Sequence, residues 1–240
     1  VCSLRVIGGV TLANGWNDGL NRLYLTVPSD SVVLEYTFSN GKWLEDTVVT
    51  HYSGDQLLAT PLRRDDTVRL YCRCIRKILE ISHSGDNWMT NEIKTAPFSI
   101  ISLIGAGPGR NDDTIRLYGD YTEITYYDAE WKVEFTGVGS SRTCIGDGRG
   151  DSIVRLYDAG LTWPDTIGEV FEYIYTETGW KKELVDAYPG EWAWVSGMWD
   201  ARIGSARNDS HSRLYFRGLE RGKRIGGLYE YTFSQGKWDW

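Results

Sequence analysis

Five copies of one short pattern of polar and aromatic residues run through this 240-residue sequence. Each copy begins with an Asp, has an Arg-Leu-Tyr that starts four residues later, and reaches a Glu after a variable stretch. An aromatic residue or a His follows that Glu by three residues, and a Trp follows it by eight. Together, such residues can hold a sugar: Arg donates to a hydroxyl or ring oxygen, Glu accepts from adjacent hydroxyls, and Trp covers the apolar C–H face. The Arg, Glu, aromatic and Trp positions are therefore candidate ligand-binding residues.

The copies are defined by the following residues. The first contains Asp18, Arg22, Tyr24, Glu35, Phe38 and Trp43. The second contains Asp65, Arg69, Tyr71, Glu80, His83 and Trp88, and the third contains Asp112, Arg116, Tyr118, Glu123, Tyr126 and Trp131. The fourth contains Asp151, Arg155, Tyr157, Glu172, Tyr175 and Trp180, and the last contains Asp209, Arg213, Tyr215, Glu230, Phe233 and Trp238. Only the distance from Arg to Glu varies, from 7 to 17 residues, which indicates two rigid segments joined by a loop that tolerates insertion.

We expect a structural role for the Asp and the Tyr of each copy, whereas for the Arg, Glu and Trp a structural role is the alternative. Arg22 on one strand and Glu35 on the next could form a cross-strand ion pair, and Asp18 could fix the preceding turn by accepting from backbone amides. The Tyr of each copy could pack between neighbouring repeats.

The repeat spacing predicts an all-β fold. A period of about 48 residues without helical patterning is typical of a β-propeller, whose blades bury their faces only against neighbours. We expect one domain over residues 1–240, a five-bladed propeller of four-stranded antiparallel blades with repeats centred on Arg22, Arg69, Arg116, Arg155 and Arg213. In the third copy the strands are predicted at 100–105, 114–118, 123–127 and 131–135.

The two ends of the chain are predicted to meet inside one blade. From Trp238 through the C-terminus and on to Asp18 there are 20 residues, close to the other Trp-to-Asp distances of 22, 24, 20 and 29. We expect 238–240 and 2–6 to share an outer strand, so that pairing of the N- and C-terminal segments closes the ring.

Composition limits the partners. A formal charge of −7 and a pI near 5.1 argue against nucleic acid, which needs basic patches, and no apolar run is long enough for membrane insertion. The chain has three His and neither a metal-ligand cluster nor a nucleophile motif, so we expect neither an enzyme nor a cofactor. Val1 in place of Met is compatible with a processed N-terminus and with an extracellular, secreted protein. Cys2, Cys72, Cys74 and Cys144 follow no metal spacing and are expected to be buried thiols, with a disulfide as the alternative.

The pattern resembles the fungal and bacterial fucose-specific lectins that are built as β-propellers. Their blades carry Arg-(Val/Ile)-Tyr, then a Glu, an aromatic residue three positions after it and a Trp eight positions after it, which Arg22, Glu35, Phe38 and Trp43 match. The resemblance extends over all five copies, although that family usually has six blades.

The resemblance implies that a sugar lies between adjacent blades, with Arg and Glu from one blade and the aromatic residues from the next. It groups the candidate residues as follows: Arg22 and Glu35 with His83 and Trp88; Arg69 and Glu80 with Tyr126 and Trp131; Arg116 and Glu123 with Tyr175 and Trp180; Arg155 and Glu172 with Phe233 and Trp238; Arg213 and Glu230 with Phe38 and Trp43. Up to five sites are implied.

Two further groups recur outside this pattern. Arg63, Arg110, Arg149 and Arg207 stand two residues before the Asp, with Trp16 in the remaining copy. We interpret them as solvated turn residues paired to nearby carboxylates, with an anion-binding ring as the alternative. Trp192, Trp194 and Trp199 lie in the longest connection, where they could cover the end of the propeller or form an extra binding platform.

The sequence thus predicts a multivalent carbohydrate-binding protein whose partners are fucosylated or similar glycans. The alternative is a protein-interaction propeller in which the repeated Asp, Arg and Glu form a structural network. The pattern leaves the oligomeric state open.

Overall fold

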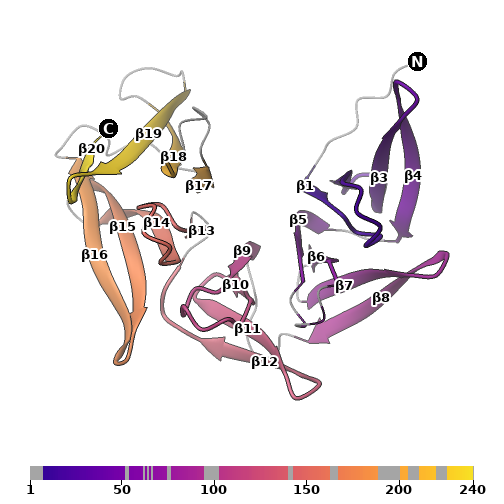
Figure 1. Ribbon diagram of the computed structural model, residues 1–240, viewed down its shortest axis with the longest axis horizontal. Helices are drawn as coiled ribbons and strands as arrows, with labels where there is room; N and C mark the ends of the chain where they lie inside the picture. The colour runs from indigo at the N-terminus through magenta and orange to yellow at the C-terminus, as the bar shows by residue number, and fades with distance from the viewer. Residues whose placement is uncertain are drawn as a thin grey trace.

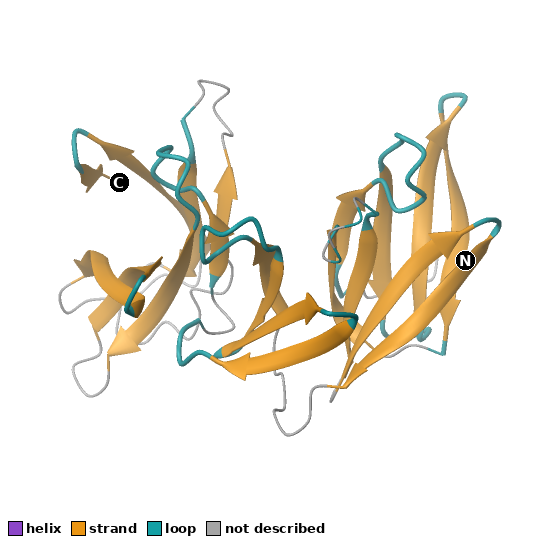
Figure 2. Ribbon diagram, turned by 60° about the horizontal axis from the view of Figure 1, so that its bottom comes forward, coloured by secondary structure: helices purple, strands orange, loops and turns teal. Residues whose placement is uncertain are grey.

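The fold is described from a computed structural model of the chain. It describes residues 8–51, 54–61, 63, 65, 67–74, 77–94, 103–139, 143–162, 167–188, 201–204, 211–219 and 226–239. These residues form strands and loops, with no helix among them (Figure 2). Accordingly, the described part of the chain contains no helix long and apolar enough to cross a membrane.

Twenty strands form five separate sheets of four strands each. The first sheet contains β1 (Val10–Ala13), β2 (Arg22–Val27), β3 (Val32–Ser39) and β4 (Lys42–Thr50). The second contains β5 (Gly54–Thr60), β6 (Arg69–Cys74), β7 (Lys77–Ser84) and β8 (Asn87–Lys94). The third contains β9 (Leu103–Gly107), β10 (Arg116–Gly119), β11 (Thr122–Tyr127) and β12 (Glu130–Phe135).

The last two sheets have the same plan. The fourth sheet contains β13 (Cys144–Gly146), β14 (Arg155–Thr162), β15 (Ile167–Thr176) and β16 (Gly179–Tyr188). The fifth contains β17 (Ala201–Gly204), β18 (Arg213–Leu219), β19 (Gly226–Ser234) and β20 (Lys237–Asp239). Within every sheet the strands follow chain order and neighbours are antiparallel, as consecutive hairpins require. The all-β prediction is confirmed, and each repeat gives one sheet.

The sheets stand side by side along an arc (Figure 1). The first strand of each sheet lies nearest the middle of the arc and the fourth lies at its periphery. Along the middle, β1 contacts β5, β5 contacts β9, β9 contacts β13, and β13 contacts β17. Between the fifth and first sheets the described ribbons leave the arc open.

Most of the core lies between neighbouring sheets. One cluster joins Tyr24 of the first sheet to Leu70 and Ile81 of the second. Another joins Tyr71 and Ile78 of the second sheet to side chains of the third. Tyr24, Tyr71, Tyr118 and Tyr157, the aromatic residues of the Arg-Leu-Tyr motifs, are 0 to 1% exposed. As expected, these four tyrosines are packing residues, whereas Tyr215 of the fifth motif is partly exposed.

The innermost strands come close because one of them is rich in glycine. A Cβ at Gly105 on β9 would lie 2.5 Å from the side chain of Ile145 on β13. Only a residue without a side chain lets the two strands approach this closely. Strand β9 extends to Gly107, two residues beyond the end of the predicted strand at 100–105, of which residues 100–102 lie outside the described residues.

Several predictions concern segments outside the described residues. They are the closing strand at 2–6 and residue 240, the connection with Trp192, Trp194 and Trp199, Arg207 and Asp209 of the fifth copy, and Cys2. Ring closure therefore stays a prediction. The thiols of Cys72 and Cys144 are buried, as expected, whereas Cys74 is partly exposed.

Candidate functional site

The Asp of each of the first four copies holds both a turn and the following arginine. The carboxylate of Asp18 accepts from the backbone N–H of Leu20 at 3.0 Å and from the Arg22 guanidinium at 2.9 and 2.7 Å. Asp151 does the same with the Ile153 amide at 3.1 Å and with Arg155 at 2.7 and 2.8 Å. The second and third copies repeat this two-pronged pairing. The predicted turn role of the Asp is confirmed in these four copies.

These ion pairs change the protonation of the aspartates. Hydrogen bonding to Arg69 lowers the pKa of Asp65 to about 2, and hydrogen bonding to Arg155 lowers the pKa of Asp151 to about 2. The pKa values of Asp18 and Asp112 are lowered by Arg22 and Arg116 for the same reason. Each carboxylate is held in its charged form because a guanidinium donates to it.

The same arginine also reaches the Glu on the neighbouring strand. In the first copy the register pairs Tyr24 with Glu35, so Arg22, two residues before Tyr24, lies diagonally opposite the carboxylate on the same face. Nε lies 3.5 Å from Glu35 in the first copy and 3.1 Å from Glu123 in the third. The corresponding distances are 4.0, 3.8 and 3.5 Å for Arg69–Glu80, Arg155–Glu172 and Arg213–Glu230. The predicted cross-strand pair is therefore present in all five copies.

The aromatic residue and the Trp of each copy face each other across a hairpin. The register pairs Phe38 with Trp43, His83 with Trp88, Tyr126 with Trp131, Tyr175 with Trp180 and Phe233 with Trp238. Their ring centroids lie 4.9 to 5.2 Å apart. In the first copy Asn40 and Gly41 have φ angles of 51° and 76°, the left-handed conformations of a two-residue hairpin turn. The spacing of three and eight residues after Glu is explained by this turn.

The Trp of one sheet then packs edge-on against the Tyr of the preceding sheet. Centroid distances are 6.0 Å for Trp88 and Tyr24, 6.2 Å for Trp131 and Tyr71, 6.3 Å for Trp180 and Tyr118, and 5.9 Å for Trp238 and Tyr157. The Trp of one repeat thus lies against the Tyr of the Arg-Leu-Tyr motif of the repeat before it at four interfaces.

The fifth grouping is not brought together in the described part of the chain. Phe38 and Trp43 of the first sheet are 60% and 55% exposed. The Glu230 side chain is 25% exposed, whereas those of the corresponding Glu80, Glu123 and Glu172 are 3%, 1% and 2% exposed. The contact of Arg213 and Glu230 with Phe38 and Trp43 stays a prediction.

A second arginine enters three of the interfaces. Arg110 donates from Nε to Glu123 at 3.0 Å, its terminal nitrogen lies 2.7 Å from the other carboxylate oxygen, and its guanidinium lies 4.8 Å from the ring centre of Tyr175. Arg63 binds Glu80 and covers Tyr126 in the same way, and Arg149 binds Glu172 and covers Phe233. These residues were expected to be solvated turn residues. They do pair with carboxylates, but with the glutamates of the candidate site, and they lie between the sheets.

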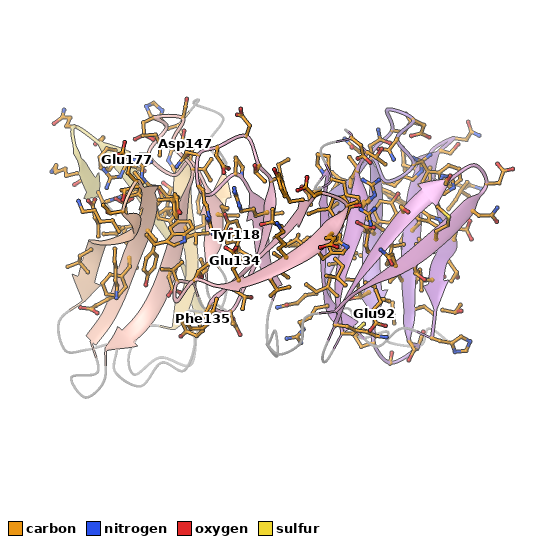
Figure 3. The ribbon with its side chains drawn as sticks, turned by 90° about the horizontal axis from the view of Figure 1, so that it is seen from below. Glu92, Tyr118, Glu134, Phe135, Asp147 and Glu177 are labelled. Carbon is orange, nitrogen blue, oxygen red and sulfur yellow. The ribbon has the colours of Figure 1, made fainter. Side chains whose placement is uncertain are left out.

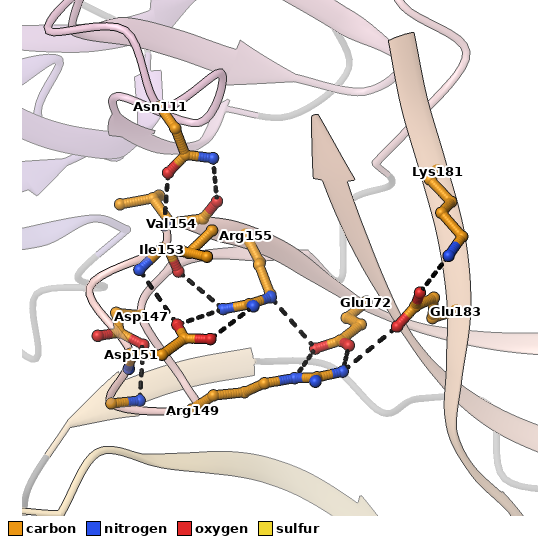
Figure 4. A network of polar contacts seen from close by, with 11 residues as sticks. Asn111, Asp147, Arg149, Asp151, Ile153, Val154, Arg155, Glu172, Lys181 and Glu183 are labelled. Carbon is orange, nitrogen blue, oxygen red and sulfur yellow. Dashed lines mark hydrogen bonds and ion pairs between the residues drawn. The ribbon is translucent and has the colours of Figure 1, made fainter. Parts of the chain in front are cut away.

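Figure 4 shows this network in the fourth sheet. Glu172 lies between the two arginines, with Arg155 on one side and Arg149 on the other, and Arg155 continues to Asp151. Glu183, on the outer strand β16, lies 3.4 Å from the same terminal nitrogen of Arg149 that pairs with Glu172. Alternating charges explain how carboxylates that are almost fully buried remain compensated.

In the first interface Trp16 takes the place of the second arginine. Its indole N–H donates to Glu35 at 2.6 Å, and its ring stacks on His83 at 4.2 Å with an interplanar angle of 13°. The Arg22 guanidinium lies 4.5 Å from the same indole. At this interface too, a side chain of the protein therefore donates to the candidate Glu and stacks on the residue at the candidate aromatic position.

Burial disfavours the charged form of Glu123. The pKa of Glu123 is raised by burial, although hydrogen bonding to Arg110 acts in the opposite direction. The pKa of Tyr71 is raised by burial and by the neighbouring Glu80, to which its hydroxyl donates at 3.0 Å. Both effects indicate a site with little water.

An asparagine joins neighbouring sheets beside this network, a role that the sequence analysis missed. Asn111 of the third repeat accepts from the Val154 amide at 2.8 Å and donates to the Val154 carbonyl at 3.2 Å (Figure 4). Asn17 forms the same two bonds with Val68, at 2.7 and 3.4 Å. The signal available in the sequence was the Asn that precedes the Asp in these copies. In the structure Asn17 and Asn111 have left-handed φ angles of 59° and 57°, a conformation that Asn adopts more readily than most residues.

Within the described ranges, no three His, Cys, Asp or Glu side chains are grouped so that they could hold a metal ion. The arrangement is suited to binding through hydrogen bonds and ring stacking. A comparison with models of protein families and with curated proteins found no match to the chain.

Proposed function

We propose that the chain is a non-enzymatic, multivalent carbohydrate-binding protein that holds fucose-like monosaccharides between adjacent sheets. The observation that carries the proposal is the convergence of a carboxylate, guanidinium groups and an aromatic ring at one interface after another. At the second interface Glu80 lies on one side and Tyr126 on the other, and the Arg63 guanidinium bridges them, with its NH1 3.2 Å from the Tyr126 hydroxyl.

The chemistry of these groups fits a sugar. A carboxylate with two acceptor oxygens can accept from two adjacent hydroxyls, and Arg69, whose Nε lies 4.0 Å from Glu80, adds a charged donor beside it. Tyr126 and Trp131, with centroids 4.9 Å apart, supply flat apolar surface for the C–H face of the ring.

We further propose that the five sheets close into a five-bladed β-propeller. The fifth sheet presents Arg213 and Glu230, and the first sheet presents Phe38 and Trp43, which are the two complementary halves of the interface seen elsewhere. Large exposed aromatic residues at an open sheet face are costly in water, and closure would bury them against Tyr215 and Arg213. A fifth site would result.

Several sites on one ring would raise the strength of binding to displayed glycans. A single shallow sugar site is weak, and simultaneous engagement of several sites can increase avidity by about 100-fold or more when the geometry permits. Glycans presented outside cells are the partners that this arrangement suits, which agrees with the expectation of secretion.

A protein-interaction scaffold is the second candidate function. This function is favoured because the Asp, Arg and Glu side chains already pair with one another: Glu172, for example, contacts both Arg149 and Arg155. In that case the repeated charges would serve the fold alone, and a protein partner would bind elsewhere on the surface.

Calorimetric titration with methyl α-L-fucoside tests the primary proposal. The unaltered protein should bind it, and Trp131→Ala should remove one site because the ring beside Tyr126 is lost. Phe135→Ala is the matched control. The Phe135 ring is 65% exposed, and it lies on the opposite side of the molecule from Asp147 in Figure 3. Absence of binding by the folded protein, or equal loss in both variants, would reject the proposal.

A further inference from the structure

Three interface arginines present the hydrogen-bonding pattern expected of a bound sugar. Arg63 donates from Nε to one oxygen of Glu80 at 2.8 Å and from a terminal nitrogen to the other oxygen. Its planar guanidinium lies 4.2 Å from the ring centre of Tyr126 on the next sheet. Arg110 and Arg149 repeat this arrangement, at 4.8 Å from Tyr175 and 4.4 Å from Phe233.

We propose that these arginines occupy the ligand positions, so that a sugar binds only when the arginine moves out, and that the second interface opens more readily than the third. The inference rests on the proposed carbohydrate-binding function. When the sugar binds, two of its adjacent hydroxyls take the place of the two parallel N–H donors of the arginine on the carboxylate. Its C–H face takes the place of the guanidinium plane on the aromatic ring.

The arginine side chains have a route to solvent. The side chains of Arg63, Arg110 and Arg149 are 22%, 24% and 22% exposed, whereas the Arg69, Arg116 and Arg155 side chains behind them are 12%, 8% and 6% exposed. The outer arginine can therefore turn outward while the inner arginine continues to compensate the buried glutamate.

The interfaces differ in how strongly this outer arginine is held. Arg110 has a second carboxylate, Glu134, at 3.0 Å, and Arg149 has Glu183 at 3.4 Å. The strand register places Glu134 opposite Glu123 and Glu183 opposite Glu172, but it places Asn91 opposite Glu80. Asn91 carries no charge, so it cannot supply a second carboxylate for Arg63. Arg63 and Arg110 each also donate to a tyrosine hydroxyl, at 3.2 and 3.3 Å, so the missing carboxylate should let Arg63 leave its glutamate at a lower cost than Arg110.

Exchanging the two outer residues tests this ranking without disturbing the core, because Asn91 and Glu134 are both exposed. Methyl α-L-fucoside is titrated into the unaltered protein, Asn91→Glu and Glu134→Asn, and the indole N–H resonances of Trp131 and Trp180 report on the second and third interfaces. In the unaltered protein Trp131 should respond at lower sugar concentration than Trp180. Asn91→Glu should raise the dissociation constant at Trp131 about two- to five-fold, and Glu134→Asn should lower it at Trp180 by about the same factor, the range for one exposed charged contact.

Arg63→Ala separates failure of this inference from failure of the proposed function. The inference is supported if Arg63→Ala binds the sugar at Trp131 at least about tenfold more tightly than the unaltered protein does. It is also supported if binding at Trp131 appears only in this variant. Sugar binding that is equal at both indoles and unchanged by all three substitutions would overturn the inference and leave the carbohydrate-binding function intact. No response of either indole in any of the four folded proteins would overturn both.

Discussion

At the scale of single residues, the network depends on charge compensation inside a site that excludes water. Glu123 is 1% exposed and has cations on two sides, Arg110 at 2.7 Å and Arg116 at 3.1 Å. The Arg116 guanidinium is in turn held by Asp112. The sequence predicted the Asp turn and the cross-strand pair, because both partners lie within one repeat. It did not predict that Arg110 enters the interface, since that position depends on the ring of Tyr175 in the next repeat.

Replacement of the inner arginine should destabilise the fold. Arg116→Ala leaves the buried Glu123 with Arg110 alone, and loss of one partner of a buried ion pair costs about 3 kcal/mol. The free energy of unfolding in urea measures this loss. Lys77→Ala, which removes an exposed ion pair with Glu92, is the control and should unfold as the unaltered protein does. Arg116→Ala with unchanged stability would show that the buried pair contributes nothing.

The aspartates should titrate at unusually low pH. Asp151 has a folded pKa of about 2 against an ordinary value of 3.8, because Arg155 donates to it. A lowered folded pKa stabilises the fold above the unfolded pKa, and the stabilisation is lost as the pH falls from about 4 to about 2. The side-chain carboxyl carbon shift of Asp151 should therefore have its midpoint near pH 2.

The Arg155→Gln variant is the control for this titration. Without the guanidinium, the midpoint of Asp151 should move upward toward 3.8. An identical midpoint in the two proteins would exclude Arg155 as the cause.

At the scale of strands and sheets, the outer hairpins were easier to predict than the innermost strands. The two-residue turn after Phe38 fixes which residue faces Trp43, and this information lies within a few residues of sequence. The innermost strand β9 reads Leu-Ile-Gly-Ala-Gly, with few side chains to mark its ends, and its position depends on contact with β13 of the next sheet. That contact cannot be read from one repeat alone.

Close packing of β9 on β13 gives an element-scale prediction. Gly105→Ala places a methyl group 2.5 Å from the Ile145 side chain, and such overpacking costs about 1 to 3 kcal/mol. The double variant Gly105→Ala with Ile145→Ala should recover part of this loss, because the clashing methyl group of Ile145 is gone. Thermal unfolding of the single and double variants measures the coupling. Strictly additive losses would mean that the two strands do not touch as described.

At the scale of the whole molecule, the number of repeats gives the number of sheets but not their closure. Four interfaces repeat the same Tyr and Trp contact, so the consecutive repeats are neighbours there. Closure requires contact between repeats at opposite ends of the sequence, and small differences in the angle between sheets add up along the arc. The described structure leaves Trp43 at 55% exposure on this open side.

Closure can be tested by comparing equivalent tryptophans. Trp131→Ala should cost about 3 kcal/mol because Trp131 packs on Tyr71. If the ring closes, Trp43→Ala should cost a similar amount, since Trp43 would pack on Tyr215. A loss below about 0.5 kcal/mol for Trp43→Ala, the range for surface substitutions, would contradict closure.

The most direct test of the proposed carbohydrate-binding function is a glycan array on the labelled, folded protein, with fucosylated glycans and their non-fucosylated counterparts side by side. The expected result is selective binding to fucosylated or closely similar glycans that free monosaccharide competes away. A blank array would contradict it and would favour a protein-interaction scaffold in which the repeated Arg and Glu serve the fold alone.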